Sequence, residues 1–496
     1  MTLTLSTDPT TYETEVLIIG AGLAGLCMAA RLKEAGQRDF LILEAASEVG
    51  GTWRDNTYPG AACDVQSHLY AYSFAPNPDW SRAFAPQQEI QRYIVETADR
   101  LSLRAHLRTG REVVRATWSE GQAPHWLVET GAGERYRARV LVSACGGLSQ
   151  PAYPQIPGLD TFRGERFHTA RWRHDVPLEG QRVGIIGTGA SAIQVIPSIA
   201  PACAHLSVFQ RTPPWVLPKP DHPVSERVRR LYRAWPGVHW LERQRIYWGL
   251  GWRVLPFALS PKAMVVAAWM GRRFLAESVP DPALRAKLTP TYTIGCKRIL
   301  MANDYYPALQ RANVDVETEG IARVDEAGVW LRDGRHVPLD VLILATGFQA
   351  ADAGAVFPTF GRDGRSLRDA WSDGPEAYKG TMVHGFPNLY LLVGPNTGLG
   401  HSSMIFMIES QVQLVMEALA RAGTRASVEV KEGAQARYNA WLQRKLNKTV
   451  WASGCNSWYQ TASGKNTTLW PSFTWHFRWI TSTWDAEDMH VRTPEA

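Results

Sequence analysis

Residues 16–44 carry the pattern that most constrains the fold of this chain. An apolar run (residues 16–19) leads into Gly20-Ala21-Gly22-Leu23-Ala24-Gly25, and a second apolar run (residues 40–43) ends in Glu44. In a strand–turn–helix unit of this kind, the first glycine permits a tight turn, the second lets the backbone approach a pyrophosphate, and the third lets helix and strand pack closely. A carboxylate at the end of the second strand accepts hydrogen bonds from ribose hydroxyls. The pattern therefore predicts a dinucleotide site.

The same pattern returns once, with one informative difference. Gly187-Thr188-Gly189-Ala190-Ser191-Ala192 follows another apolar run and opens a helix-like stretch. Glu44 lies 24 residues after Gly20, and the same offset from Gly187 reaches Arg211. A carboxylate at this position suits a free ribose 2′-hydroxyl, whereas a cation suits a 2′-phosphate. We therefore expect FAD or NAD at the first turn and NADPH at the second, with Arg211 and Thr212 on the 2′-phosphate. Taken alone, Arg211 is equally well a solvated strand-end charge.

Two dinucleotides in one chain imply electron transfer between them, and they suggest how the chain is divided. We expect an α/β fold with two Rossmann-like dinucleotide-binding domains and a helical insertion. A Pro-rich stretch at residues 150–158 is typical of a linker. The expected parts are 1–151 (FAD domain, first part), 152–218 (NADPH domain, first part), 219–290 (helical insertion), 291–348 (NADPH domain, second part) and 349–496 (FAD domain, second part).

Composition excludes several classes of protein. The chain has 496 residues, of which 45% are hydrophobic and 20% charged, as in ordinary globular proteins. Its net charge of +6 comes without a dense Lys/Arg run, so nucleic-acid binding is not indicated. We expect no membrane-spanning segment, because no clean run of about 20 apolar residues exists. The stretch at 246–270 is apolar but interrupted by charges and Pro, which leaves a membrane-surface helix open and favours buried packing. The aromatic tail (Trp451, Trp458, Trp470, Trp475, Trp479, Trp484) also favours packing, with an apolar substrate pocket lined by some of these residues as the alternative.

The six cysteines are scattered, with no Cys-x-x-Cys pair. This spacing favours reduced thiols in a cytoplasmic compartment and argues against a zinc site or a disulfide framework. The first twelve residues lack the charged and apolar regions of a signal peptide. We therefore expect a cytoplasmic protein without a bound metal.

A longer pattern, Phe162-x-Gly164-x-x-x-His168-x-x-x-Trp172, lies just before the second glycine turn. Together with Gly50-Gly51-x-Trp53, Tyr58-Pro59-Gly60, Asp64 and Lys297-Arg298, it resembles the flavin-containing Baeyer–Villiger monooxygenases (class B flavoprotein monooxygenases). The resemblance covers nearly the whole chain. Related enzymes that oxidise nitrogen or sulfur tend to have another aromatic residue in place of Trp172. The chain departs from the family at Arg173, where Pro or Asp is usual.

The resemblance implies a reaction as well as a fold. NADPH would reduce FAD, reduced flavin and O2 would form a peroxyflavin, and the peroxide anion would attack a ketone to give an ester or lactone. Developing negative charge in a water-poor site calls for a fixed cation. The resemblance gives this role to Arg298, held by Asp64, with Lys297 assisting at the NADPH phosphate. Arg suits the role because it stays protonated when desolvated.

The resemblance also implies a set of residues at the two dinucleotides. The expected contacts are Gly20, Gly22, Gly25, Glu44, Thr52, Trp53, Asp64, Tyr70, Val113, Gly187, Thr188, Gly189, Ala190, Ser191, Ala192, Gln194, Arg211 and Thr212. His168 belongs to the linker pattern and receives no proton-transfer role. His401 would lie near the flavin, although a single His in a loop is more often structural.

Two other functions remain open at this stage. A flavin monooxygenase that oxidises sulfur or nitrogen of small molecules would use the same cofactors. A flavin reductase or a non-catalytic nucleotide sensor would bind the cofactors and transfer no oxygen. Analysis of the products from a ketone and a sulfide in parallel separates the three. Which ketone would be the substrate cannot be inferred from any of the motifs.

Overall fold

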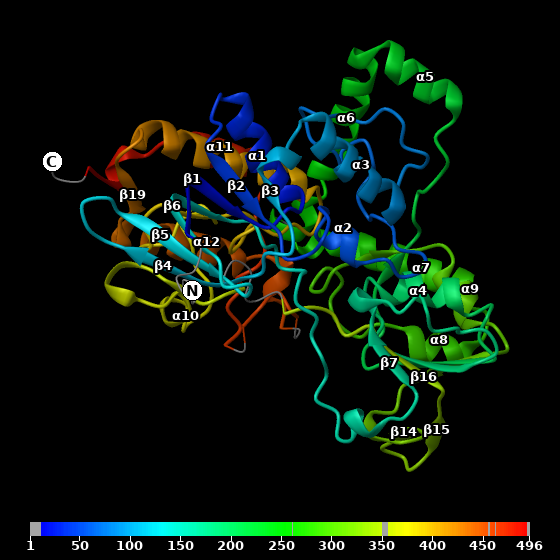
Figure 1. The fold of residues 1–496 in the computed structure, drawn as a ribbon. Coiled ribbons are helices and arrows are strands. Elements are labelled where there is room, and N and C mark those ends of the chain that lie inside the picture. The colour runs from blue at the N-terminus through cyan, green and yellow to red at the C-terminus, as the bar shows by residue number, and fades with distance from the viewer. Residues whose placement is uncertain (1–10, 260, 350–355, 455–456, 462, 494–496) are drawn as a thin grey trace.

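The computed structural model describes the chain except residues 1–10, 260, 350–355, 455–456, 462 and 494–496. The fold is built around two largely parallel sheets, which Figure 1 shows in separate regions of the molecule, the first at the upper left and the second at the lower right. The sheet that begins the chain is the larger, with strand order β17-β4-β5-β6-β1-β2-β3 and β18 paired to β6. Its strands are β1 (Thr11–Ile19), β2 (Phe40–Leu43), β3 (Leu107–Arg108), β4 (Val113–Ser119), β5 (His125–Thr130), β6 (Arg135–Ser143), β17 (Thr359–Phe360) and β18 (Leu389–Leu391).

The second sheet holds the second glycine turn. Its strand order is β12-β9-β8-β16-β7, and every neighbouring pair is parallel. Its strands are β7 (Glu165–His168), β8 (Arg182–Ile186), β9 (His205–Phe209), β12 (Val314–Glu317) and β16 (Val341–Leu344). Three small sheets complete the strands: β10 (Val216–Leu217) with β11 (Leu300–Met301), β13 (Ile321–Asp325) with β14 (Gly328–Leu331) and β15 (His336–Pro338), and β19 (Ser427–Val430) with β20 (Met489–Arg492).

Helices cover the sheets and form the segment between β10 and β11. They are α1 (Leu23–Glu34), α2 (Thr52–Asp55), α3 (Gln87–Arg100), α4 (Ala192–Ile199), α5 (Glu226–Ala234), α6 (Pro236–Gly251), α7 (Met264–Ser278), α8 (Pro282–Leu288), α9 (Tyr305–Leu309), α10 (Leu367–Ala370), α11 (Met404–Ala422), α12 (Glu432–Leu446) and α13 (Thr474–Ser482). Residues 255–259 form one π-helical turn. Among the described residues, no helix is long and apolar enough to cross a bilayer, and no group of three or more acidic, His or Cys side chains is placed to hold a metal ion.

The core of the first sheet follows from its sequence. In β1 the last four residues are buried, as expected for a parallel strand covered on both faces. Helix α1 packs against α11 and contributes small buried side chains such as Ala29 and Ala30, which let the helices approach closely. Helix α11 ends at Gly423, whose φ of 58° favours glycine.

Two linkers connect the two sheets, and they are paired with each other. The amide of Ala152 donates to the carbonyl of Gly347 (2.9 Å), and the amide of Gln349 donates to the carbonyl of Gln150 (2.9 Å). The hydroxyl of Thr346 donates to the carbonyl of Ala152 (2.6 Å). The chain therefore leaves and re-enters the first region through two adjacent, hydrogen-bonded segments.

Three expectations from the sequence are wrong. The apolar stretch at 246–270 is not uniformly buried, because its outward-facing side chains lack a covering element, and Trp248, Trp252 and Trp269 are each about half exposed or more. The aromatic tail is split in the same way: Trp451 and Trp470 are buried, whereas Trp458, Trp475 and Trp479 are exposed.

The thiol expectation fails at one position. Cys27, Cys63, Cys145 and Cys203 are free, but Cys296 is disulfide-bonded. Sequence spacing could not reveal this bond, because a disulfide needs proximity in the fold and not in the chain. Cys455 lies outside the described residues.

Candidate active site

The first glycine turn has the geometry of a phosphate cradle. Gly20 has φ = 101°, and a Cβ there would lie 2.9 Å from the carbonyl oxygen of Ala144. A Cβ on Gly25 would lie 1.9 Å from the carbonyl oxygen of Gly20, so the helix can approach the strand only with glycine at this position. Gly22 faces Gly51, at 3.7 Å from its Cβ position to the Cα atom. Four glycines therefore leave room for a ligand backbone at the start of α1.

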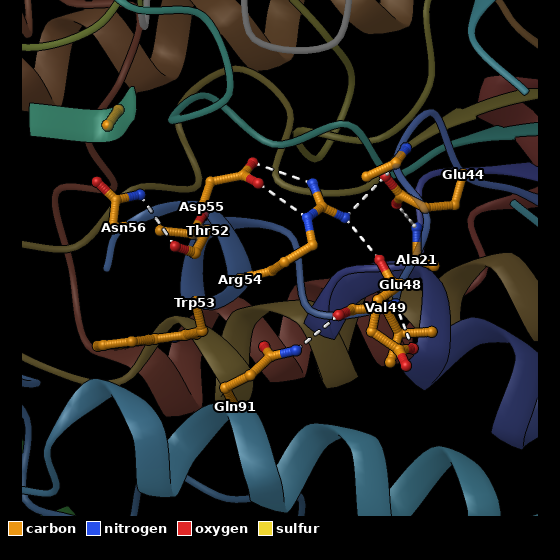
Figure 2. A network of polar contacts seen from close by, with 12 residues as sticks. Ala21, Glu44, Glu48, Val49, Thr52, Trp53, Arg54, Asp55, Asn56 and Gln91 are labelled. Atoms are coloured by element: carbon orange, nitrogen blue, oxygen red, sulfur yellow. Dashed lines mark hydrogen bonds and ion pairs between the residues drawn. The ribbon is translucent and has the colours of Figure 1, made fainter. Parts of the chain in front are cut away.

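Glu44 is buried beside this turn and is held by three donors. Its Oε2 accepts from the amide of Ala21 (2.8 Å), and its Oε1 accepts from the amide of Ala46 (3.0 Å). The third donor is Nη1 of Arg54, 2.9 Å from Oε1, which also reaches the carbonyl oxygen of Glu48 (Figure 2). The carboxylate is therefore fixed in orientation and keeps lone pairs for a further donor.

Arg54 is a site residue that the motif analysis missed. Figure 2 shows its guanidinium between Glu44 and Asp55, which accepts from Nε (2.8 Å) and Nη2 (3.0 Å). The signal in the sequence was its place directly after Trp53, on the short helix α2 that follows the Gly50-Gly51 turn. Its net effect is to tie α2 to the end of β2.

Thr52, Trp53 and Tyr70 lie close to the first turn. Thr52 begins α2, and the indole Nε1 of Trp53 donates to the hydroxyl of Tyr70 (3.0 Å), with the two rings edge to face at 5.7 Å. Val113 begins β4 and packs in a different apolar cluster of the same sheet from that of Trp53 and Tyr70. The structure therefore groups three of these four residues.

The second glycine turn repeats the cradle. Gly187 has φ = 114°, and its Cβ position lies 2.4 Å from the carbonyl oxygen of Ala345. Around the Cβ position of Gly189, no atom of the described chain comes within 4 Å, so the loop is open where a ligand would approach. The hydroxyl of Thr188 donates to the carbonyl oxygen of Thr212 (3.0 Å), which ties the turn to the segment after β9. Ala190 and Ser191 lead into α4, which starts at Ala192.

Gln194, on α4, joins this turn to the loop after α2. Its Oε1 accepts from the hydroxyl of Tyr58 (3.1 Å) and the amide of Ala62 (3.4 Å), and its Nε2 donates to the carbonyl of Ala62 (3.0 Å). The backbone contact is equally close, because a Cβ on Gly60 would lie 2.5 Å from the carbonyl oxygen of Gln194. The two regions therefore meet without intervening side-chain layers.

Arg298 and Asp64 form an ion pair across these two regions. Nε of Arg298 donates to Oδ2 of Asp64 (2.8 Å), and Nη2 contacts the same oxygen. Asp64 raises the pKa of Arg298 well above its usual range, so the guanidinium stays charged. About one third of each side chain is exposed, which leaves the cation open to a further anionic partner.

Tyr459 is a second residue at this site that the motifs did not indicate. It is fully buried, its pKa is raised to about 12 by burial, and Arg298 and Asp64 act on it electrostatically. Burial also raises the pKa of the Cys63 thiol next to Asp64. Arg298 and Asp64 thus lie near two groups, Tyr459 and Cys63, that burial keeps neutral. No local spacing links Tyr459 to Arg298, so only the fold could reveal the contact.

Lys297 lies near Arg211, which follows β9. Burial lowers the pKa of Lys297, and the nearby charge of Arg211 lowers it further. Its ammonium lies 4.9 Å from the ring centroid of Tyr292. Two neighbouring cations, Lys297 and the exposed Arg211, therefore face one region beyond the end of β9, where the sequence predicts the 2′-phosphate.

The loop before α11 contains buried polar atoms without a partner. Both ring nitrogens of His401, the hydroxyl of Ser402 and Oδ1 of Asn396 make no hydrogen bond among the described residues. Burial lowers the pKa of His401 to about 4, with a further contribution from Arg253. Since buried polar groups are normally satisfied, this loop fits a ligand that supplies the missing partners.

The linker pattern has a structural explanation. A Cβ on Gly164 would lie 2.3 Å from the carbonyl oxygen of Asp340, and Trp172 packs edge to face on Phe167 at 5.1 Å. His168 is buried between the two linkers, its Nδ1 accepts from the amide of Ala170 (3.0 Å), and burial lowers its pKa to about 4. Arg173 is exposed and pairs with Asp175, so the unusual residue at this position disturbs no packing.

Comparisons with known proteins show the family and the fold of this chain. Residues 17–233 match the family model for pyridine nucleotide-disulphide oxidoreductases. A Baeyer–Villiger monooxygenase of Pseudomonas aeruginosa is 50% identical over 99% of this chain and 94% of its own length. The crystal structure of cyclohexanone monooxygenase from Rhodococcus sp. Phi1 bound to NADP+ is 31% identical, with a TM-score of 0.88 over 98% of this chain and 100% of that chain. OTEMO in complex with FAD and NADP is 28% identical, with a TM-score of 0.86 over 97% and 99%.

Proposed function

The chain belongs to the Baeyer–Villiger monooxygenase family, and on that premise we propose how its residues insert one oxygen atom of O2 beside the carbonyl of a ketone. The enzyme is FAD-dependent, takes its electrons from NADPH, and gives an ester or a lactone. The alternative of sulfur or nitrogen oxidation is not favoured, because the structural neighbours include cyclohexanone monooxygenases.

The residues present fit two dinucleotides. Glu44 and the Gly20 turn would hold FAD, with the ribose on the carboxylate that Ala21 and Arg54 orient. The unsatisfied atoms of His401 and Ser402 support placing the flavin ring against the loop before α11. The Gly187 turn would hold NADPH. When bound and reduced, FAD supplies the activation of O2 that no side chain can provide.

One observation supports the assignment of the reacting centre. The adjacent cations Arg298 and Lys297 interact with different regions, Arg298 with that of the first glycine turn and Lys297 with that of the second. Arg298 is paired with Asp64 on the side of the first turn. The charge of Arg211, on the side of the second turn, lowers the pKa of Lys297. Arg298 would stabilise negative charge that develops on the attacking oxygen and the carbonyl. Asp64 holds the guanidinium in place and keeps it protonated, and Lys297 would bind the 2′-phosphate.

The test is a product analysis. The FAD-loaded protein receives NADPH and ¹⁸O2 with a panel of linear, cyclic and aromatic ketones, and with a sulfide in parallel. We expect an ester or lactone carrying one ¹⁸O atom from at least one ketone, with one NADPH consumed per product. If NADPH is consumed with release of hydrogen peroxide and no ketone gives an ester, the assignment as a ketone-oxidising enzyme is wrong. Sulfoxide as the main product would support the alternative, oxidation of sulfur.

We also propose that the enzyme works in the cytoplasm. Four free cysteines support this, because oxidising compartments select against unpaired thiols. The disulfide at Cys296 is the opposing observation. Cell fractionation, with thiol labelling of Cys296 before and after reduction, tests both points: recovery of the protein in a secreted or periplasmic fraction would contradict the proposal.

A further inference from the structure

The positive charge of this protein is concentrated in the helices between β10 and β11. Residues 225–278 contain ten Lys or Arg and three acidic residues, a net charge of +7. The whole chain carries +6, so the remaining residues together are close to neutral. Within the described part of the chain, the exposed cations Arg227, Arg230 and Lys262 form no ion pair. The charge is therefore available to an external partner.

The outer face of α6 is apolar. Its inner side packs into the core of the first region through Ile246, Tyr247 and Leu250. On the opposite side four apolar residues recur at helical spacing, with exposed fractions of 37% (Val238), 59% (Leu241), 49% (Trp248) and 60% (Trp252). A helix whose outer stripe is apolar and whose neighbours are basic has the composition of a helix lying in a membrane interface.

Helix α13 extends this face. Its Thr474 bonds to Tyr247 of α6 (3.1 Å between the hydroxyl oxygens), and Phe473 lies edge to face with Trp252 at 6.4 Å. Phe473 in turn stacks on Trp475, so the contact continues along α13. Trp475 and Trp479, one turn apart, are 48% and 62% exposed. Here the surface formed by Val238, Leu241, Trp248, Trp252, Trp475 and Trp479 is called the tryptophan face.

We propose that the tryptophan face docks on an anionic lipid bilayer surface. Trp is the residue that favours the membrane–water interface, since its ring is apolar and its N–H still finds polar partners. Arg245 lies within the stripe of α6 with 67% of its side chain exposed, which places a cation beside the indoles. The net charge of +7 complements anionic headgroups and does not suit a neutral or basic protein partner.

The arrangement in Figure 1 is compatible with such docking. Helices α5 and α6 project at the upper right, away from the second sheet at the lower right. The six residues of the tryptophan face include neither Arg298 nor Asp64, so the face can be substituted without changing that pair. Docking would be peripheral, because no described helix can span a bilayer.

The experiment is vesicle flotation of the FAD-loaded enzyme. We expect the wild type to float with vesicles of phosphatidylcholine and phosphatidylglycerol, and not with phosphatidylcholine alone. Raising NaCl to about 0.5 M should weaken binding at least about tenfold, because it screens the headgroup attraction. The Trp248→Ser/Trp252→Ser/Trp475→Ser/Trp479→Ser variant should lose at least about tenfold in affinity. Should it fail to load FAD, the Trp248→Ser/Trp479→Ser pair takes its place.

The matched control removes exposed apolar residues outside the tryptophan face. Val114 and Val491, 45% and 49% exposed on β4 and β20, are replaced together by Ser, and flotation should be unchanged. Equal flotation of wild type and tryptophan variant would overturn the proposal, as would failure of the wild type to bind anionic vesicles. Sedimentation velocity tests whether a second copy of the chain, and not a membrane, covers the tryptophan face. A wild-type dimer that dissociates in the tryptophan variant, with no binding to vesicles, would also overturn the proposal.

Discussion

The hydroxyl of Tyr58 donates to the side-chain oxygen of Gln194 at 3.1 Å, and this hydrogen bond joins the two dinucleotide-binding regions. Both groups belong to segments that the two glycine turns position, one to the loop after α2 and the other to α4. The relative placement of the two cofactors therefore depends on a small number of polar contacts.

Replacing Gln194 by Ala should loosen this contact. The change removes three hydrogen bonds to Tyr58 and Ala62, each contributing about 1 kcal/mol. We expect a several-fold rise in the KM for NADPH and more hydrogen peroxide per NADPH, with FAD content unchanged. Steady-state kinetics with peroxide detection measures both. Tyr58→Phe, which removes one of the bonds, should have a smaller effect, and wild-type behaviour of both variants would show that the contact is dispensable.

Arg298→Met should separate reduction from oxygen transfer. The variant keeps an unbranched apolar stem and loses the guanidinium with its charge, so Asp64 remains without its partner. We expect FAD reduction by NADPH within about threefold of wild type and ester formation lower by about 10²-fold or more, the size of losing one donor to a developing anion. Stopped-flow absorbance and product chromatography give the two rates. Asp64→Asn should show a smaller loss, because the guanidinium remains, and normal ester yield from Arg298→Met would exclude the cation from the mechanism.

Arg211→Ala should reduce the discrimination between NADPH and NADH. The affinity for NADPH should fall about 10- to 100-fold, as expected for a charge-assisted contact, while that for NADH stays nearly constant. Arg332→Ala, which changes an exposed arginine after β14, serves as the control. Equal losses for both nucleotides would show that Arg211 does not reach the 2′-phosphate.

The same site should respond to alkaline pH. The pKa of Lys297 is lowered by burial and by Arg211, so its charge is lost at lower pH than that of an ordinary lysine. The affinity for NADP+ should therefore decline as the pH rises toward the pKa of a free lysine. Titration by fluorescence, with Lys297→Met as reference, checks this: the variant should bind more weakly and lose the pH dependence in this range.

Buried histidines should make the protein sensitive to acid. His68 on the loop after Asp64 and His239 on α6 lie 3.0 Å apart between ring nitrogens, and burial lowers the pKa of both, that of His68 from 6.5 to about 4. A group with a lowered folded pKa binds fewer protons in the folded state, so the free energy of unfolding falls as the pH drops below 6.5 and continues to fall until about 4.

Urea unfolding at several pH values measures this loss. His68→Gln should reduce the slope between pH 6.5 and 4.5 by up to about 1.4 kcal/mol per pH unit, the contribution of one proton. The exposed His222, replaced by Gln, should leave the slope unchanged. An identical slope in His68→Gln and wild type would show that this histidine does not carry the sensitivity.

The sequence predicted what depends on local chain geometry. The strand–Gly20–helix and strand–Gly187–helix units were recognisable because glycine spacing and apolar runs act over a few residues. The positions of Glu44 and Arg211 at the ends of the strands that follow these turns come from the same units, whereas Lys297 was indicated only by the family resemblance.

Contacts between distant segments were not predictable. Tyr459 lies near enough to Arg298 to act on it electrostatically, and His68 contacts His239, across long stretches of chain, and no periodicity encodes such pairs. The exposure of Trp248 and Trp252 is a similar case. An apolar helix stripe normally indicates a covering partner in the same chain, so the sequence favoured burial, and only the absence of a described covering element shows otherwise.

The pairing of the two linkers has a mechanical consequence. A single flexible connection would let the two cofactor-binding regions rotate about any axis relative to each other. Two segments bonded side by side through Ala152, Gly347 and Gln349 behave as a strip, which bends easily across its width and resists torsion. Any rotation of one region relative to the other would therefore bend this strip more easily than it would twist it.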